Sequence, residues 1–294
     1  MKPKLNSPAR VQLAFLLPLL LCSLAMSVAA EDPKPAPAEE QKPAPIFPDK
    51  QLEAAVRKFV FDKRDNDKPL VESELANLST IQGNGMGITN LAGLEKCVNL
   101  ASLDLANNKI TDLSPLKGMA RLQYLNVAQN QIEDIGPLGD ARALQYIELS
   151  TNRVKNIQPL ASLTNLASLY LSHNELSDIA PIVRLPRMAS LYLDHNKLKS
   201  VEGVGHLGGL NSLSFNNNSI ADLSPLDGLT NLYFLSLENN KVRDLGPLLE
   251  MARKDKEQRF APFINVYLKG NPLAPNAKKD QISGLKQIGA RIFP

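Results

Sequence analysis

The chain has 294 residues, with 33 lysines and arginines against 30 aspartates and glutamates. Three of the basic residues and none of the acidic ones lie in residues 1–30, so the rest of the chain is balanced at 30 against 30. That balance leaves no basic stripe for a nucleic acid or an anionic membrane surface. Cys97 is the one cysteine beyond residue 30, which excludes an intramolecular disulfide there.

Residues 1–30 have the pattern of a bacterial-type export signal: a basic start, an apolar core over residues 11–21, and small residues before a cleavage site after Ala30. We expect the signal to be cleaved, which would make the protein secreted or periplasmic with no transmembrane span after processing. The alternative is a membrane anchor, either an uncleaved signal or a lipid on Cys22. Leu21 stands where a lipoprotein signal prefers a small residue, which disfavours the lipid.

The next two segments precede the main part of the chain. Residues 31–47 are rich in proline, alanine, glutamate and lysine, a composition that predicts an extended tether. Residues 48–74 are expected to form an N-terminal helical cap, in which Asp49 begins a helix with Leu52 and Val56 on one face. Such a cap would cover the core that a repeat array exposes at its first unit.

Residues 75–273 repeat one 22-residue unit. Its central apolar position recurs from Ile81 to Leu235, and a ninth unit around Val266 arrives nine residues late, which predicts a charged insertion near residues 252–260. A fixed period of this length predicts a solenoid, and residues 274–294 are expected to be its C-terminal cap. An asparagine recurs at the corner after each apolar frame, where its amide can bond unpaired backbone groups. This asparagine row is structural and comprises Asn108, Asn130, Asn152, Asn174, Asn196, Asn218, Asn240 and Asn271.

The unit has a strand in front and a turn behind. Alternation as in Leu103-Asp-Leu105 has the two-residue period of a strand with one buried face. Prolines such as Pro115 and Pro137 recur on the return path, where a residue without an N–H donor suits a turn or a 3₁₀ segment.

This pattern resembles the leucine-rich repeat family, in the 22-residue class of bacterial internalins and of the phosphatase-regulating subunit of eukaryotic cells. The resemblance covers residues 47–294. It implies an α/β solenoid: a right-handed arc with a parallel β-sheet on the concave face, 3₁₀ and turn segments on the convex face, and helical caps. It also implies protein binding without catalysis. No cell-wall anchor motif follows the repeats, so the invasion role of internalins is not transferred, and the export signal argues against the cytosolic phosphatase role.

The outward strand positions carry five of the six tyrosines. Strand propensity alone is one explanation. We favour a ligand surface, because exposed tyrosines among Asp, Asn and Ser are typical of binding hot spots. We therefore expect a monomer that binds a protein or peptide on its concave face. The candidate contact residues are Tyr124, Tyr146, Tyr170, Tyr192, Asp104, Asn126, Glu148, Asp194, Phe234, Glu238 and Tyr267.

Signals for catalysis are weak. His173 and His195 occupy equivalent positions in neighbouring units, and with Asp194 they form a candidate metal site, although solvated surface histidines are the favoured interpretation. The Gly203-Val-Gly205-His-Leu-Gly208 run lacks the strand and long helix of a dinucleotide site. We expect no catalytic residue, no metal and no cofactor. The alternatives to a binding protein are a non-specific cell-envelope or matrix protein and, less favoured, a metal-dependent hydrolase.

Overall fold

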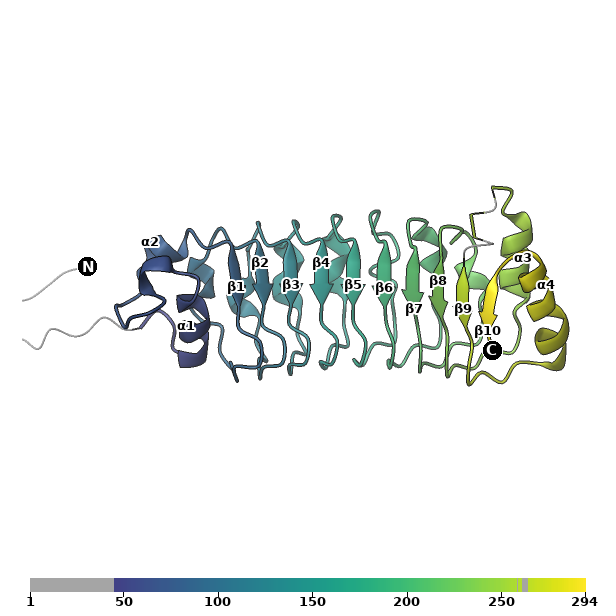
Figure 1. Cartoon of the computed structure of the whole chain (residues 1–294), viewed down its shortest axis with the longest axis horizontal. Helices are drawn as coiled ribbons and strands as arrows, with labels where there is room; N and C mark the ends of the chain where they lie inside the picture. The colour runs from purple at the N-terminus through teal and green to yellow at the C-terminus, as the bar shows by residue number, and fades with distance from the viewer. Residues whose placement is uncertain (1–44, 258, 261–263) are drawn as a thin grey trace, which may run out of the picture. The chain divides into compact units, whose positions relative to one another are not determined.

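The computed structural model describes residues 45–257, 259–260 and 264–294. The expected export signal, Cys22 and residues 31–44 of the expected tether lie outside the described residues. Ten parallel strands form one curved, unclosed sheet in which each strand pairs with the next along the chain (Figure 1). Within the described ranges, no helix has the length and apolar character needed to cross a bilayer.

Each strand is three residues long, with the middle side chain buried and the flanking side chains on the opposite face. The register follows the 22-residue period, so Leu103 pairs with Leu125 and Leu125 with Ile147. This arrangement confirms the expected parallel solenoid. The strands are β1 (Thr80–Gln82), β2 (Ser102–Asp104), β3 (Tyr124–Asn126), β4 (Tyr146–Glu148), β5 (Ser168–Tyr170), β6 (Ser190–Tyr192), β7 (Ser212–Ser214), β8 (Phe234–Ser236), β9 (Asn265–Tyr267) and β10 (Arg291–Phe293).

The return paths run behind the sheet and are mostly short 3₁₀ segments, as expected from the recurring prolines. Pro115 and Pro137 each lie near the start of such a segment. The first N–H groups of a helical segment have no partner within it, so proline costs no hydrogen bond there. One return path is longer and forms the helix α3 (Gly246–Lys254), which accounts for part of the delay of the ninth unit. The 3₁₀ segments are η2 (Leu94–Lys96), η3 (Ser114–Leu116), η4 (Gly136–Asp140), η5 (Gln158–Ser162), η6 (Val204–His206) and η7 (Ser224–Leu226).

The N-terminal cap is helical, as expected, and contains α1 (Lys50–Arg57), η1 (Phe61–Lys63) and α2 (Glu72–Leu75). The Asp49 side chain caps α1, which buries Leu52 and Val56. Phe47, expected in the tether, is only 1% exposed and belongs to the core. Its ring lies so close to Gly93 that a side chain there would collide with it. Phe47 therefore belongs to the repeat core and not to the expected tether.

The C-terminal cap contains a π-helical turn, η8 (Ala277–Gln281), the helix α4 (Ile282–Gln287) and the strand β10. The helices were expected, but the tenth strand was not. Its central residue, Ile292, follows Val266 by 26 positions and so falls outside the 22-residue period. The sequence signal for this strand was the alternation in Arg291-Ile292-Phe293. In the structure, Ile292 is buried and its two neighbours are exposed.

The asparagine row joins each unit to the one before it. The Asn152 amide donates to the carbonyl of Leu149 in its own unit and to that of Val127 in the preceding unit, both at 3.0 Å. Its oxygen accepts the backbone N–H of Ile132 at 3.0 Å. The carbonyls of Val127 and Leu149 each accept a second bond, from Asn130 and Asn174. The buried N–H of Ile132 depends on Asn152 alone, so that bond avoids a cost of about 1–3 kcal/mol.

The residue before each of seven row asparagines has a left-handed backbone, with φ between 53° and 58°. L-residues other than glycine and asparagine adopt this conformation at a cost of about 1–2 kcal/mol. The corner is therefore a strained position in the units where Gln129, Thr151 or a histidine occupies it. The seven residues are Asn107, Gln129, Thr151, His173, His195, Asn217 and Asn239.

Candidate binding surface on the sheet

Seven aromatic rings lie side by side along the outward face of the sheet, and we call them the aromatic ladder. Neighbouring rings have centroids 4.6 to 6.2 Å apart, with the shortest spacing between Tyr124 and Tyr146 and between Tyr267 and Phe293. These spacings fall in the range of favourable aromatic pairs. The ladder comprises Tyr124, Tyr146, Tyr170, Tyr192, Phe234, Tyr267 and Phe293.

The stacking decides which parts of the rings can meet a ligand. Tyr146 packs at 4.6 Å against Tyr124 on one side and at 5.3 Å against Tyr170 on the other, so ring neighbours flank it on both sides. Tyr170 is flanked in the same way by Tyr146 and Tyr192. All four tyrosines are half-buried. They therefore offer ring edges and hydroxyl groups, which suit a partner that exchanges hydrogen bonds.

The aromatic ladder is continuous across β7, whose outward side chains are small. Tyr192 of β6 and Phe234 of β8 lie 6.2 Å apart although β7 separates their strands. Ser214 of β7 is only 1% exposed even though its position faces outward. Its hydroxyl donates to the carboxylate of Asp194 at 2.5 Å, which satisfies the buried group. Serine at this position leaves room for the two larger rings on either side.

Four carboxylates lie on the same face of the sheet. Glu148 accepts the backbone N–H of Ser150 at 2.7 Å, and Asp194 accepts that of Asn216 at 2.6 Å. In the part of the chain that the structure describes, none of the four takes part in an ion pair. The four outward carboxylates belong to Asp104, Glu148, Asp194 and Glu238.

Two of these carboxylates contribute to the raised pKa values of Tyr124 and Tyr146. Burial, followed by the charge of Glu148, raises the pKa of the Tyr146 phenol far above its usual value. Burial and then the charge of Asp104 raise the pKa of Tyr124. The phenols therefore remain neutral at physiological pH and keep their O–H donors. The face around them has a negative potential.

The two histidines stack on each other at the edge of this face. The ring centroids of His173 and His195 are 4.0 Å apart, and Nε2 of His195 lies 3.0 Å from the amide nitrogen of Asn217. The Asp194 carboxylate accepts hydrogen bonds from the hydroxyl of Ser214 on β7 and from the backbone N–H of Asn216, just beyond that strand. Among the described residues, no three His, Cys, Asp or Glu side chains gather so as to hold a metal ion.

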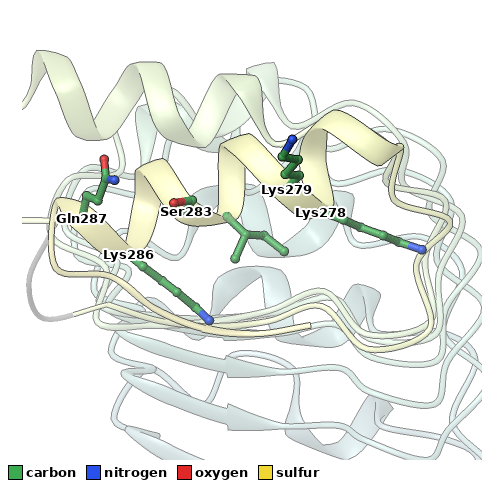
Figure 2. Close-up of a pocket in the computed structure, with 6 residues that line it drawn as sticks. Lys278, Lys279, Ser283, Lys286 and Gln287 are labelled. Atoms are coloured by element: carbon green, nitrogen blue, oxygen red, sulfur yellow. The ribbon is translucent and has the colours of Figure 1, made fainter.

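A shallow hollow lies on the C-terminal cap (Figure 2). Lys278 and Lys286 extend toward the same side of the helical segment, beside Ser283. Among the lining residues there is no carboxylate, histidine or cysteine, and the three lysines give the hollow a positive charge. It is lined by Lys278, Lys279, Ile282, Ser283, Lys286 and Gln287.

The structure brings the six aromatic candidates of the sequence into one continuous ladder. Asn126 lies beside Asp104 in the register of β2 and β3, and Glu148 beside Tyr170 in that of β4 and β5. Phe293, the last ring of the ladder, was missed because β10 falls outside the repeat period. Ser214 is buried at an outward strand position, and its burial depends on ring positions that strand alternation does not reveal.

The family comparisons agree with this fold. Models described as leucine-rich repeats match residues 99–119, 120–162, 142–198 and 209–250. A search of curated proteins finds no match for the chain.

Several solved structures are similar to it. Internalin C2 of Listeria monocytogenes is 27% identical with a TM-score of 0.68, over 76% of this chain and 95% of that one. A leucine-rich repeat protein of Leptospira interrogans is 21% identical with a TM-score of 0.59, over 75% of this chain and 62% of that one. The plant peptide hormone receptor RGFR1, solved in complex with RGF2, is 24% identical with a TM-score of 0.53, over 62% of this chain and 30% of that one.

Proposed function

Because this chain is a leucine-rich repeat protein of the internalin-like kind, we propose that it is an exported, monomeric protein that binds a protein or peptide on the concave face of its sheet, without catalysis. The observation that carries the proposal is the aromatic ladder. Half-buried tyrosines surrounded by Asp, Asn and Ser have the composition of a binding hot spot.

The extent of the ladder supports a macromolecular ligand. Its rings run from β3 to β10, which is seven strand spacings of about 4.7–4.9 Å, or roughly 33 Å. A small molecule would cover only a fraction of this length, whereas a peptide or a folded domain can follow it. The peptide in the RGFR1 complex is a precedent for the class of ligand in a distant member of the fold.

Stacking also distinguishes a protein ligand from a polysaccharide. Sugars bind aromatic residues through open ring faces, but the faces of Tyr146 and Tyr170 are directed at neighbouring rings. What these residues offer to solvent suits hydrogen-bonding partners such as peptide groups and polar side chains. This favours a protein or peptide.

The test is affinity capture from the native extracellular or periplasmic fraction with three forms of the protein. Wild type should recover a saturable partner, and Tyr146→Ala/Tyr170→Ala should not. Phe61→Ala/Tyr233→Ala is the matched control, because it removes two exposed rings that lie outside the ladder. Circular dichroism should show that all three forms are folded. If the ladder variant recovers the partner as well as the control does, the proposal fails.

Export is supported by the sequence of residues 1–30 and has its own test. N-terminal sequencing of protein recovered outside the cytoplasm should give a chain that begins at Glu31. A chain that begins at Cys22 with a lipid would show the anchored alternative instead.

A further inference from the structure

From β1 to β8, all the charged side chains at the outward positions of the sheet are negative. From β1 to β8, no outward strand position holds a lysine or an arginine, whereas four hold a carboxylate. Lys269 and Arg291, at the far end beside β9 and β10, are the first basic residues on this face. The ladder thus runs through a surface with four uncompensated negative charges. Two of them, on Asp104 and Glu148, add to the effect of burial in raising the pKa values of Tyr124 and Tyr146.

The carboxylates recur at a regular interval across the strands, in two columns that lie two residues apart along the strand direction. They lie on β2, on β4, just beyond β6 and just beyond β8, which places one on every second unit. Two strand spacings are about 9.4–9.8 Å. An extended polyproline-II chain advances about 3.1 Å per residue, so every third side chain recurs after about 9.3 Å. An extended peptide lying across the strands would bring every third side chain to a carboxylate.

We propose that the aromatic ladder binds an extended cationic peptide segment, whose lysines or arginines pair with Asp104, Glu148, Asp194 and Glu238. This inference rests on the proposed function of the sheet as the binding face and adds the chemistry of the partner. The tyrosine hydroxyls bond the peptide backbone, and the carboxylates select positive side chains. Such complementarity speeds association and disfavours partners of the wrong charge.

The basic side chains of the repeats do not cancel this field. Lys109, Arg153, Lys197 and Lys241 follow the asparagine corner and lie outside the strands. Within the described residues, none of them forms an ion pair with an outward carboxylate, and Lys197 pairs instead with Glu175 at 2.6 Å.

The experiment uses the full-length protein and two fluorescent peptides, four repeats of Arg-Pro-Pro and four repeats of Glu-Pro-Pro. The binding variant is Asp104→Asn/Glu148→Gln, which removes two negative charges and keeps the shapes of the two side chains. The matched control, Asp140→Asn/Glu202→Gln, removes two exposed charges from the return paths. Fluorescence anisotropy at low ionic strength should show that wild type and control bind the arginine peptide equally. The binding variant should bind it about tenfold more weakly, as expected for two partly exposed ion pairs.

Raising the salt to a Debye length of about 3 Å should weaken binding of the arginine peptide, and the glutamate peptide should not bind. Three results would overturn the inference: no binding of the arginine peptide by wild type, equal binding by both double variants, or equal binding of both peptides. The proposed function is judged separately, by the loss of the native partner in Tyr146→Ala/Tyr170→Ala. If that variant loses the partner while Asp104→Asn/Glu148→Gln keeps it with unchanged affinity, the face binds but the cationic chemistry is wrong.

Discussion

The carboxylate of Asp49 bonds to Thr89, 40 residues away in sequence, and thereby joins the N-terminal helix to the first repeat. One oxygen accepts the backbone N–H of Thr89 at 2.8 Å, its hydroxyl at 3.0 Å and the N–H of Asn90 at 3.0 Å. The other oxygen caps α1 through the N–H groups of Gln51 and Leu52. A single side chain thus starts the cap helix and fixes it over the open end of the core.

We expect Asp49→Ala to reduce the free energy of unfolding by about 2–4 kcal/mol, because it removes a helix cap and charge-assisted hydrogen bonds together. Urea denaturation checks the value. Hydrogen exchange should show α1 opening before the repeats, since the cap loses its link to them. Asp62→Ala, which removes an exposed carboxylate from the same cap, should change stability little. An equal loss in both variants would contradict the role assigned to Asp49.

The Asp49 link also has a pH dependence. Burial acts to raise the pKa of Asp49, but the hydrogen bonds from Thr89, Leu52 and Asn90 outweigh it and hold the pKa below its usual value. A depressed folded pKa means that the stabilisation is complete above the unfolded pKa of about 3.9 and is lost as the pH falls through the folded value. The stability difference between wild type and Asp49→Ala should be constant from pH 7 to 5 and shrink below about pH 4. A difference that grows on acidification would contradict this sign.

Asn152→Ala tests the asparagine row. It leaves the buried N–H of Ile132 without its acceptor and removes one of the two amide donors from each of the carbonyls of Val127 and Leu149, so we expect a loss of about 1–3 kcal/mol in the free energy of unfolding. Gln131→Ala, at an exposed position, is the control and should cost little. A similar effect of both substitutions in chemical denaturation would mean that the corner bonds do not stabilise the array.

The left-handed corner predicts a stabilising substitution. Thr151 is β-branched and has a φ of 58°, whereas asparagine occupies the same corner at Asn107 and tolerates this conformation. Thr151→Asn should raise the free energy of unfolding by about 0.5–1 kcal/mol, and the reverse change, Asn107→Thr, should lower it by a similar amount. Thermal and urea unfolding measure both. Changes of the same sign would show that backbone strain does not control this position.

Cys97 should be unreactive in the folded protein. Burial, with a smaller contribution from the charge of Glu95, raises the pKa of its thiol to about 12. In a Cys22→Ser protein at pH 8, we expect labelling by Ellman's reagent to be on the order of a thousandfold slower than in denaturant, because so little thiolate is present. Rapid labelling under native conditions would mean that the first repeat is open around Cys97.

The repeat period predicted the fold because each unit has the same length, so the apolar frame of one unit falls in register with the next. The same register places Tyr124 beside Tyr146 and Tyr170 beside Tyr192. Features that break the period were not predictable in this way. Phe47 lies in a proline-rich segment but is buried against Gly93, and Phe293 lies on a strand that is out of phase.

The chemistry of the binding face needed three-dimensional information. The sequence indicates which residues face outward, but not that the rings lie close enough to cover one another. The burial of Ser214 likewise follows from Tyr192 and Phe234, which belong to the strands on either side. The recurrence of an outward carboxylate on every second unit is readable from the sequence, but the lack of ion-pair partners for the four within the described residues is not.

The central claim is that the aromatic ladder is the surface that holds the partner. Its most direct test is the dissociation constant of the captured partner for Tyr146→Ala/Tyr170→Ala, measured with folded protein beside wild type and Phe61→Ala/Tyr233→Ala. Because loss of a hot-spot residue costs about 2 kcal/mol or more, we predict that the ladder variant binds at least about thirtyfold more weakly while the control binds like wild type. Equal dissociation constants for all three proteins would contradict the account.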